Sequence, residues 1–113
     1  MPALDSAAAL FRSLSDVTRL AIVRRLAAGE ARVADLVDET GLAQSTVSAH
    51  IACLRGCKLV VGRPDGRQVF YSLARAELLD VLAAAEVVLA ATGNAAALCP
   101  RSGAESARSE GEP

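Results

Sequence analysis

Two cysteines one helical turn apart are the residues of this chain best suited to chemistry. Cys53 and Cys57 lie four residues apart in the stretch STVSAHIACLRGCKLV, residues 45–60. Residues i and i+4 of a helix lie on one face, with Cβ atoms roughly 5–6 Å apart. A metal ion bridges two such thiolates easily at about 2.3 Å from each sulfur, whereas a disulfide there would strain the helix. The spacing therefore predicts a two-thiolate clamp.

The third thiol, Cys99, directly precedes Pro100 in a C-terminal segment from which it could reach the other two. Three thiolates without an evident fourth ligand suit a soft ion with a trigonal or pyramidal preference. This chemistry favours Cd(II) or Pb(II) and leaves As(III) open. A single helical cysteine is more often a small buried hydrophobe. Because Cys53 and Cys57 share a helix face and Cys99 has no core to fill, we predict all three as metal ligands.

Other uses of the thiols are possible. In a redox switch, Cys53 or Cys57 would be oxidised and joined to Cys99, and an oxidant would act without metal. A thiol enzyme needs an activated cysteine with a base beside it. His50 is the single histidine and lies one turn from Cys53, but no third residue orients it and no second domain forms a cleft. We therefore predict that the chain is not an enzyme. A constitutive DNA-binding protein with incidental cysteines is a further alternative.

The composition predicts a small helical protein in a reducing compartment. The chain has 113 residues, 52% of them hydrophobic and only 3% aromatic, which suits one domain with an aliphatic core. No apolar run reaches the length of a membrane span. Asp5 and Arg12 interrupt the N-terminal apolar residues, so a secretory signal is not expected. Three cysteines without a secretory context favour a cytoplasmic protein with no membrane association.

The net charge of −1 conceals a basic span. Residues 44–75 contain a single anion, Asp65, and five cations, which are Arg55, Lys58, Arg63, Arg67 and Arg75. Such a span suits the neutralisation of a phosphate backbone. The alternative is a solvated face that happens to lack acidic residues.

Four helices are expected before and within a DNA-binding motif. Residues 6–14 predict a short helix, and Asp16 is a suitable N-cap for a second helix that ends at Gly29. Residues 33–39 predict a compact helix, and a turn at residues 40–42 leads into a helix over residues 44–57. Two short helices about a Gly-containing turn form the helix-turn-helix pattern.

The apolar period then changes from 3.6 to 2. This predicts two strands over residues 59–63 and 68–73, joined by a turn at residues 64–66 in which Pro presets φ and Gly accepts a positive φ. A final helix over residues 75–92 is too apolar all round to stand alone in water. We expect a mainly α winged helix-turn-helix that forms a homodimer through its N- and C-terminal helices. Residues 1–98 would be the DNA-binding and dimerisation domain, and residues 99–113 a flexible tail.

The N-terminal residues of the second helix of such a motif meet base edges in the major groove. Here they are mostly short and polar, as direct readout requires, although the same residues would also simply solvate an exposed helix. The wing adds further predicted contacts. The predicted DNA-binding residues are Gln44, Ser45, Thr46, Ser48, Ala49, His50, Arg63, Arg67 and Gln68.

Three segments, SLSDVTRLAIVRRL, DLVDETGLAQSTVSAHIACLRGCKLV and GRQVFYSL, resemble the ArsR/SmtB family of bacterial winged-helix metal-sensing repressors over about residues 6–98. The resemblance implies a cytoplasmic homodimer that occupies an inverted-repeat operator and leaves it when metal binds. The spacing CLRGC, with a cysteine beyond the last helix, resembles the cadmium- and lead-sensing CmtR branch. That resemblance carries over Cys53, Cys57 and Cys99 as ligands, with Cys99 supplied by the same or by the other protomer.

Two residues depart from the family pattern at the ends of the helix over residues 44–57. Ala43 stands where many members have a capping Ser, so the helix start should be less stable by ~1 kcal/mol. Lys58 stands where Gly usually ends the helix. Either Lys58 adopts left-handed geometry at a cost of about 1 kcal/mol or more, or the helix ends differently.

Overall fold

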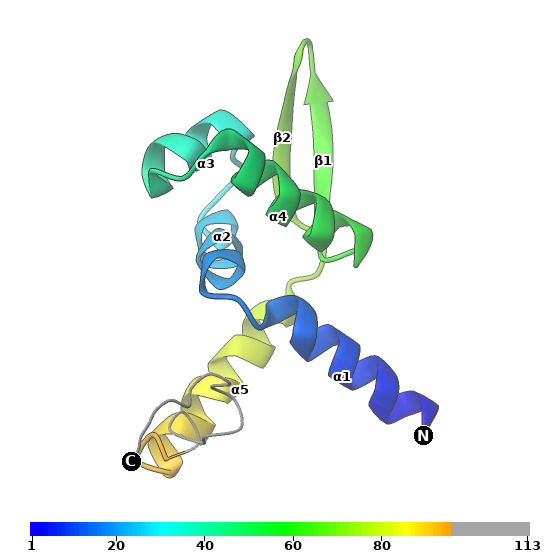
Figure 1. Ribbon diagram of the computed structural model, residues 1–113, viewed down its shortest axis with the longest axis vertical. Helices are drawn as coiled ribbons and strands as arrows, with labels where there is room; N and C mark the ends of the chain where they lie inside the picture. Colours follow the sequence, from blue (N-terminus) through cyan, green and yellow to red (C-terminus); the bar gives the residue numbers. More distant parts are fainter. Residues whose placement is uncertain (96–113) are drawn as a thin grey trace. The chain divides into compact units, whose positions relative to one another are not determined.

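The computed structural model describes residues 1–95 and confirms the predicted fold class. In chain order the elements are α1 (Pro2–Leu14), α2 (Val17–Ala27), α3 (Val33–Thr40), α4 (Gln44–Gly56), β1 (Val60–Asp65), β2 (Gln68–Leu73) and α5 (Glu77–Ala91) (Figure 1). The first unit, Met1–Ala76, contains α1 to α4 and the hairpin, and α5 opens a second unit at Glu77. The predicted ligand Cys99, the domain boundary at residue 98 and the predicted flexible tail lie outside the described residues.

The core of the first unit is aliphatic. α2, α3 and α4 contact one another or the hairpin, and their largest fully buried side chains are Ile22, Val23, Leu36, Val47 and Leu54. No polar or charged side chain is buried in residues 1–95. Hydrophobic burial therefore positions the helix-turn-helix.

The helix starts are partly as expected. Asp16 caps α2, as predicted, because its Oδ1 accepts a hydrogen bond from the Arg19 amide at 3.0 Å. The expected start of the first helix at residue 6 was wrong, since α1 begins at Pro2. Proline is well suited to a first helical position, where its missing N–H has no partner to lose.

The hairpin differs from the prediction at its turn. β1 and β2 pair antiparallel with Asp65 opposite Gln68, so the loop consists of Gly66 and Arg67 and not of residues 64–66. Gly66 has a φ of 64°, as its predicted role requires. Pro64 lies within β1, opposite Val69. A proline is tolerated there because no strand within residues 1–95 pairs with the outer edge of β1, so its missing N–H breaks no ladder bond.

The base of the wing is fixed to the loop before α3. Ala31 and Tyr71 exchange two backbone hydrogen bonds of 3.1 and 2.8 Å. Gly62 packs under the same tyrosine, and a Cβ on Gly62 would lie 2.9 Å from Val69 Cγ1 and 3.0 Å from Tyr71 Cε1. A larger residue at position 62 would therefore displace side chains on β2.

Among residues 1–95, none of the helices combines the length and apolar character needed to cross a bilayer.

Candidate DNA-reading helix and thiol site

The N-terminal half of α4 has one buried and one exposed face. Val47 and Ile51 are buried against the core, while the opposite face is polar and open. Of the predicted contacts on this helix, Gln44, Ser45, Thr46 and Ala49 are exposed, and Ser48 and His50 are half-buried. Four of the six predicted contacts are thus open to a DNA groove, and two are partly covered.

The first turn of α4 has no side-chain cap. Ala43 is the N-cap residue and makes no side-chain hydrogen bond, as its methyl group dictates. We expect Ala43→Ser to raise the free energy of unfolding by ~1 kcal/mol, because a hydroxyl would accept a hydrogen bond from an unpaired amide of the first turn. Denaturant unfolding measures this change. The matched control is Ala52→Ser at an exposed position within the same helix, where serine should give no gain.

His50 contacts α2. Its Nδ1 accepts a hydrogen bond from Arg19 Nε at 3.3 Å, and its Nε2 lies 4.0 Å from Asp16 Oδ1. The hydrogen bond from the Arg19 amide holds the pKa of Asp16 below its usual value. His50 is thus positioned by α2, and any base contact that it makes must use the exposed part of the ring. The sequence reasoning did not find Arg19, because helix periodicity leaves this arginine on the solvent side.

The two predicted wing cations differ in their surroundings. Arg63 is paired with Glu30 through hydrogen bonds of 3.0 and 2.8 Å, and its guanidinium carbon lies 5.1 Å from the ring centre of Phe70. The hydrogen bonds from Arg63 lower the pKa of Glu30. Arg67 lies exposed in the two-residue turn and forms no ion pair within residues 1–95. Gln68 is exposed beside it. Arg67 is therefore the wing residue best placed for a phosphate.

The C-terminal end of α4 confirms the left-handed alternative for Lys58. Lys58 has a φ of 64°, and its amide donates to the Arg55 carbonyl at 2.9 Å. The Leu59 amide donates to the Leu54 carbonyl at 2.9 Å. These two bonds form the Schellman arrangement that usually has glycine in the left-handed position. The helix end is therefore ordered although its sequence departs from the usual one.

The two thiols of α4 lie one turn apart at this end, as predicted. The Cys57 amide donates to the Cys53 carbonyl at 3.1 Å. Both cysteines are free, Cys53 half-buried and Cys57 exposed. The Sγ of Cys57 also lies 3.1 Å from the Oγ of Ser13 in α1. No sequence signal identified Ser13, because a serine at the end of an Ala-rich helix is unremarkable without its partner.

Comparison with known proteins gives the family of this fold. The model for the bacterial regulatory proteins of the arsR family matches residues 16–61, which are α2 to the start of β1. The HTH-type transcriptional regulator CmtR of Mycobacterium tuberculosis is 45% identical over 84 residues, covering 74% of this chain and 71% of the relative. The chain belongs to the ArsR family.

Two further likenesses support this assignment. A probable mercury resistance operon repressor of Streptomyces lividans is 37% identical over 94 residues, covering 83% of this chain and 74% of that protein. The solved structure of a homodimeric winged helix-turn-helix DNA-binding domain from Mycobacterium bovis, a possible ArsR-family regulator, has a TM-score of 0.69 at 31% identity, covering 77% of this chain and 81% of that one. The ArsR-family chain is thus a winged helix-turn-helix transcriptional regulator of the metal-sensing type, not an enzyme.

The donor set of this ArsR-family regulator fits a soft ion only in part. Sulfur ligands select soft metals, and two free thiols on adjacent turns satisfy that requirement. Within residues 1–95, no group of three or more His, Cys, Asp or Glu side chains could hold a metal ion. A three-coordinate site therefore needs a ligand in addition to Cys53 and Cys57. The predicted third ligand, Cys99, meets this need chemically.

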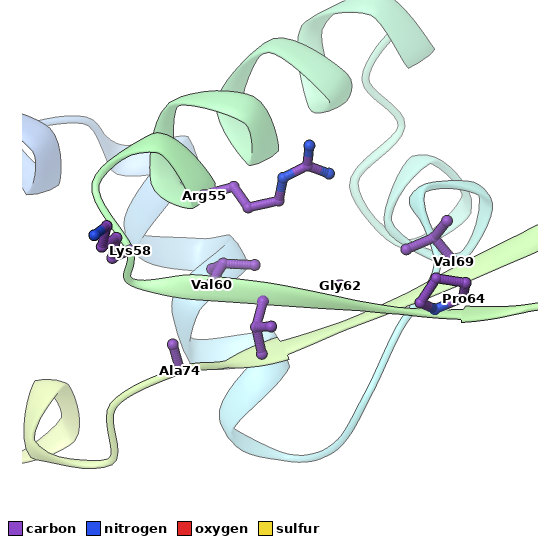
Figure 2. Close-up of a pocket in the computed structure, with 8 residues that line it drawn as sticks. Arg55, Lys58, Val60, Gly62, Pro64, Val69 and Ala74 are labelled. Carbon is purple, nitrogen blue, oxygen red and sulfur yellow. The ribbon is translucent and has the colours of Figure 1, made fainter.

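An open groove of about 520 Å³ lies along β1 beside the end of α4. Figure 2 shows Arg55 extending over the strand, with Lys58 and Val60 at the helix side and Pro64 and Val69 toward the turn. Two of the five cations of the basic span therefore lie at this groove, away from the polar N-terminal face of α4. The residues that line it include neither Cys53 nor Cys57.

Proposed function

We propose that this ArsR-family chain is a transcriptional repressor that binds operator DNA as a homodimer without metal and is released by a soft thiophilic ion. The ligands are Cys53, Cys57 and Cys99, and the ion is Cd(II) or Pb(II), with As(III) as a further candidate. The observation that supports the proposal is that two free thiols, Cys53 in α4 and Cys57 at its C-cap, lie on the helix whose exposed residues we predict to read bases. A change at one end of a rigid helix moves its other end.

The homodimer is supported by apolar surface that the single chain leaves uncovered. Leu4 and Phe11 of α1 are 59% and 58% exposed, and Val87 and Val88 of α5 are 67% and 54% exposed. Clusters of large exposed apolar side chains mark interaction surfaces. A two-fold homodimer presents two identical reading helices, for which the matching operator is an inverted repeat.

Release requires that the ion bind the off-DNA arrangement more tightly than the DNA-bound one. A tie from Cys53 and Cys57 to Cys99 would restrain α4 relative to the C-terminal segment and bias the spacing or tilt of the two reading helices. A coupling free energy of about 1–3 kcal/mol lowers operator occupancy about 5- to 150-fold. Because the ligands bind as thiolates, metal affinity is expected to rise with pH.

The decisive experiment is a titration of the reduced protein with Cd(II), followed by ultraviolet absorption. A thiolate-to-metal charge-transfer band that saturates at one ion per protomer, and that is weakened in Cys99→Ser, is expected for the three-thiolate site. A full-strength band in Cys99→Ser would remove Cys99 from the site. The absence of any band in the wild-type protein would contradict the metal proposal.

A thiol redox switch is the second candidate, because Cys57 is both free and exposed. Exposed thiols are the ones that oxidants reach. In that case a disulfide oxidant would release operator DNA without metal, and Cd(II) would have no effect. Measuring operator binding with diamide and with Cd(II) separately distinguishes the two functions.

The wing contact gives an independent prediction for DNA binding. Arg67→Ala should weaken binding to all sequences alike and lower the salt slope of log K by about one unit, since one phosphate contact is lost. Fluorescence anisotropy at several salt concentrations measures both quantities. The control is Arg12→Ala on α1, which should leave the slope unchanged. An unchanged slope in Arg67→Ala would exclude this residue from the phosphate contacts.

A further inference from the structure

The hydroxyl of Ser13 connects the end of α1 to a predicted metal ligand. Ser13 Oγ lies 3.1 Å from Cys57 Sγ, and either atom can be the donor. The same oxygen donates to the Ala9 carbonyl at 3.2 Å. A serine hydroxyl has one hydrogen and two lone pairs, and a thiol has one hydrogen. In the metal-free thiol form, Cys57 can therefore donate to Ser13 while Ser13 donates to Ala9.

Metal binding replaces the S–H hydrogen of Cys57. A metal-bound sulfur has no S–H, so it can only accept. The contact between Ser13 and Cys57 then persists only when Ser13 turns its single hydrogen from the Ala9 carbonyl to the sulfur. Hydrogen bonds of this kind orient metal ligands and tune their donor strength. The state of the Cys57 sulfur thus determines the direction of the Ser13 hydrogen bond.

Ser13 is joined to α4 by a second path. Its carbonyl oxygen accepts a hydrogen bond of 2.7 Å from Arg19 Nη1, and Arg19 Nε donates to His50 Nδ1 at 3.3 Å. His50 and Cys57 lie seven residues apart on α4 and its C-cap. The end of α1 and the start of α2 therefore hold the reading helix at two points, one at the thiol and one near the base-reading face.

We propose that Ser13 is a positioning residue of the thiol site: its hydroxyl orients the Cys57 sulfur, donates to it when metal is bound, and links metal occupancy to the base-reading half of α4 through Arg19 and His50. This inference rests on the proposed metal-sensing function. It adds a residue from α1 to a site that otherwise involves α4 and the C-terminal segment.

The test compares Ser13→Ala with Ser13→Thr, which keeps the hydroxyl, and with Ser6→Ala, an exposed serine on the same helix. Cd(II) affinity, taken by competition with a chelator, should fall about 10- to 100-fold in Ser13→Ala and be largely kept in the other two. The thiolate-to-metal band should also move to longer wavelength in Ser13→Ala, because the sulfur lone pair loses a stabilising hydrogen bond. A purely structural role would not shift this band.

Two outcomes distinguish a failure of the proposed role of Ser13 from a failure of the proposed metal-sensing function. Equal Cd(II) affinity and equal band position in Ser13→Ala and Ser6→Ala, with a normal wild-type response, would overturn the role of Ser13 and leave the metal-sensing function intact. No band in the wild-type protein would overturn both. Far-ultraviolet circular dichroism and thermal unfolding of the metal-free variants verify that each variant is folded.

Discussion

Cys53→Ser is expected to abolish metal-induced release while leaving operator binding by the metal-free protein unchanged. The hydroxyl cannot replace a thiolate toward a soft ion, so the clamp on α4 loses one of its two ligands. Cys53 is half-buried and lies beyond the exposed residues of the reading face. In the wild-type protein, a coupling free energy of about 1–3 kcal/mol should lower operator occupancy about 5- to 150-fold when Cd(II) binds. In Cys53→Ser, Cd(II) should leave operator occupancy unchanged.

Anisotropy titrations of an operator duplex, with and without Cd(II), measure this ratio. Ala52→Ser is the matched control, since it introduces the same side chain at the neighbouring exposed position and should release normally. If metal-free Cys53→Ser fails to bind the operator, the role of this cysteine is structural. Normal release by Cys53→Ser would exclude it as a ligand.

Leu54→Ala is expected to lower the free energy of unfolding by about 2–5 kcal/mol. Leu54 has 0% exposure, and its carbonyl accepts the Leu59 amide at the end of α4. Truncation leaves a cavity beneath the helix that carries both thiols, so metal affinity should fall together with stability. Denaturant unfolding monitored by circular dichroism measures the loss.

The control for this prediction is Val61→Ala, which removes an apolar side chain that is 50% exposed on β1. It should cost no more than about 1 kcal/mol. A similar loss in both variants would mean that Leu54 does not belong to a close-packed core.

The parts of the fold that the sequence predicted well depend on local signals. Asp16 before α2 is a local N-cap signal. The four-residue spacing of buried residues such as Val47 and Ile51 follows from helix periodicity. The hairpin turn was misplaced by one or two residues, because Pro64 and Gly66 are both turn formers and only the register of the strands decides between them. That register depends on pairing with β2.

The candidate site was predictable only where its residues are close in sequence. Cys53 and Cys57 could be paired because a helix brings i and i+4 together. Ser13 and Arg19 reach α4 by tertiary packing across more than thirty positions, and no local pattern contains that information. The pairing of Arg63 with Glu30 was missed for the same reason, since it joins the wing to the loop before α3.

Pro64 affects the tendency of the protein to aggregate through the edge of its hairpin. β1 forms the outer edge of the hairpin, and an exposed edge with unpaired N–H groups can recruit a strand from another molecule. Pro64 has no N–H to offer, and it lies opposite Val69 near the far end of the hairpin. The proline therefore interrupts any ladder that a second hairpin could build on the first. Copies of the protein at high local concentration would be protected from edge-to-edge aggregation.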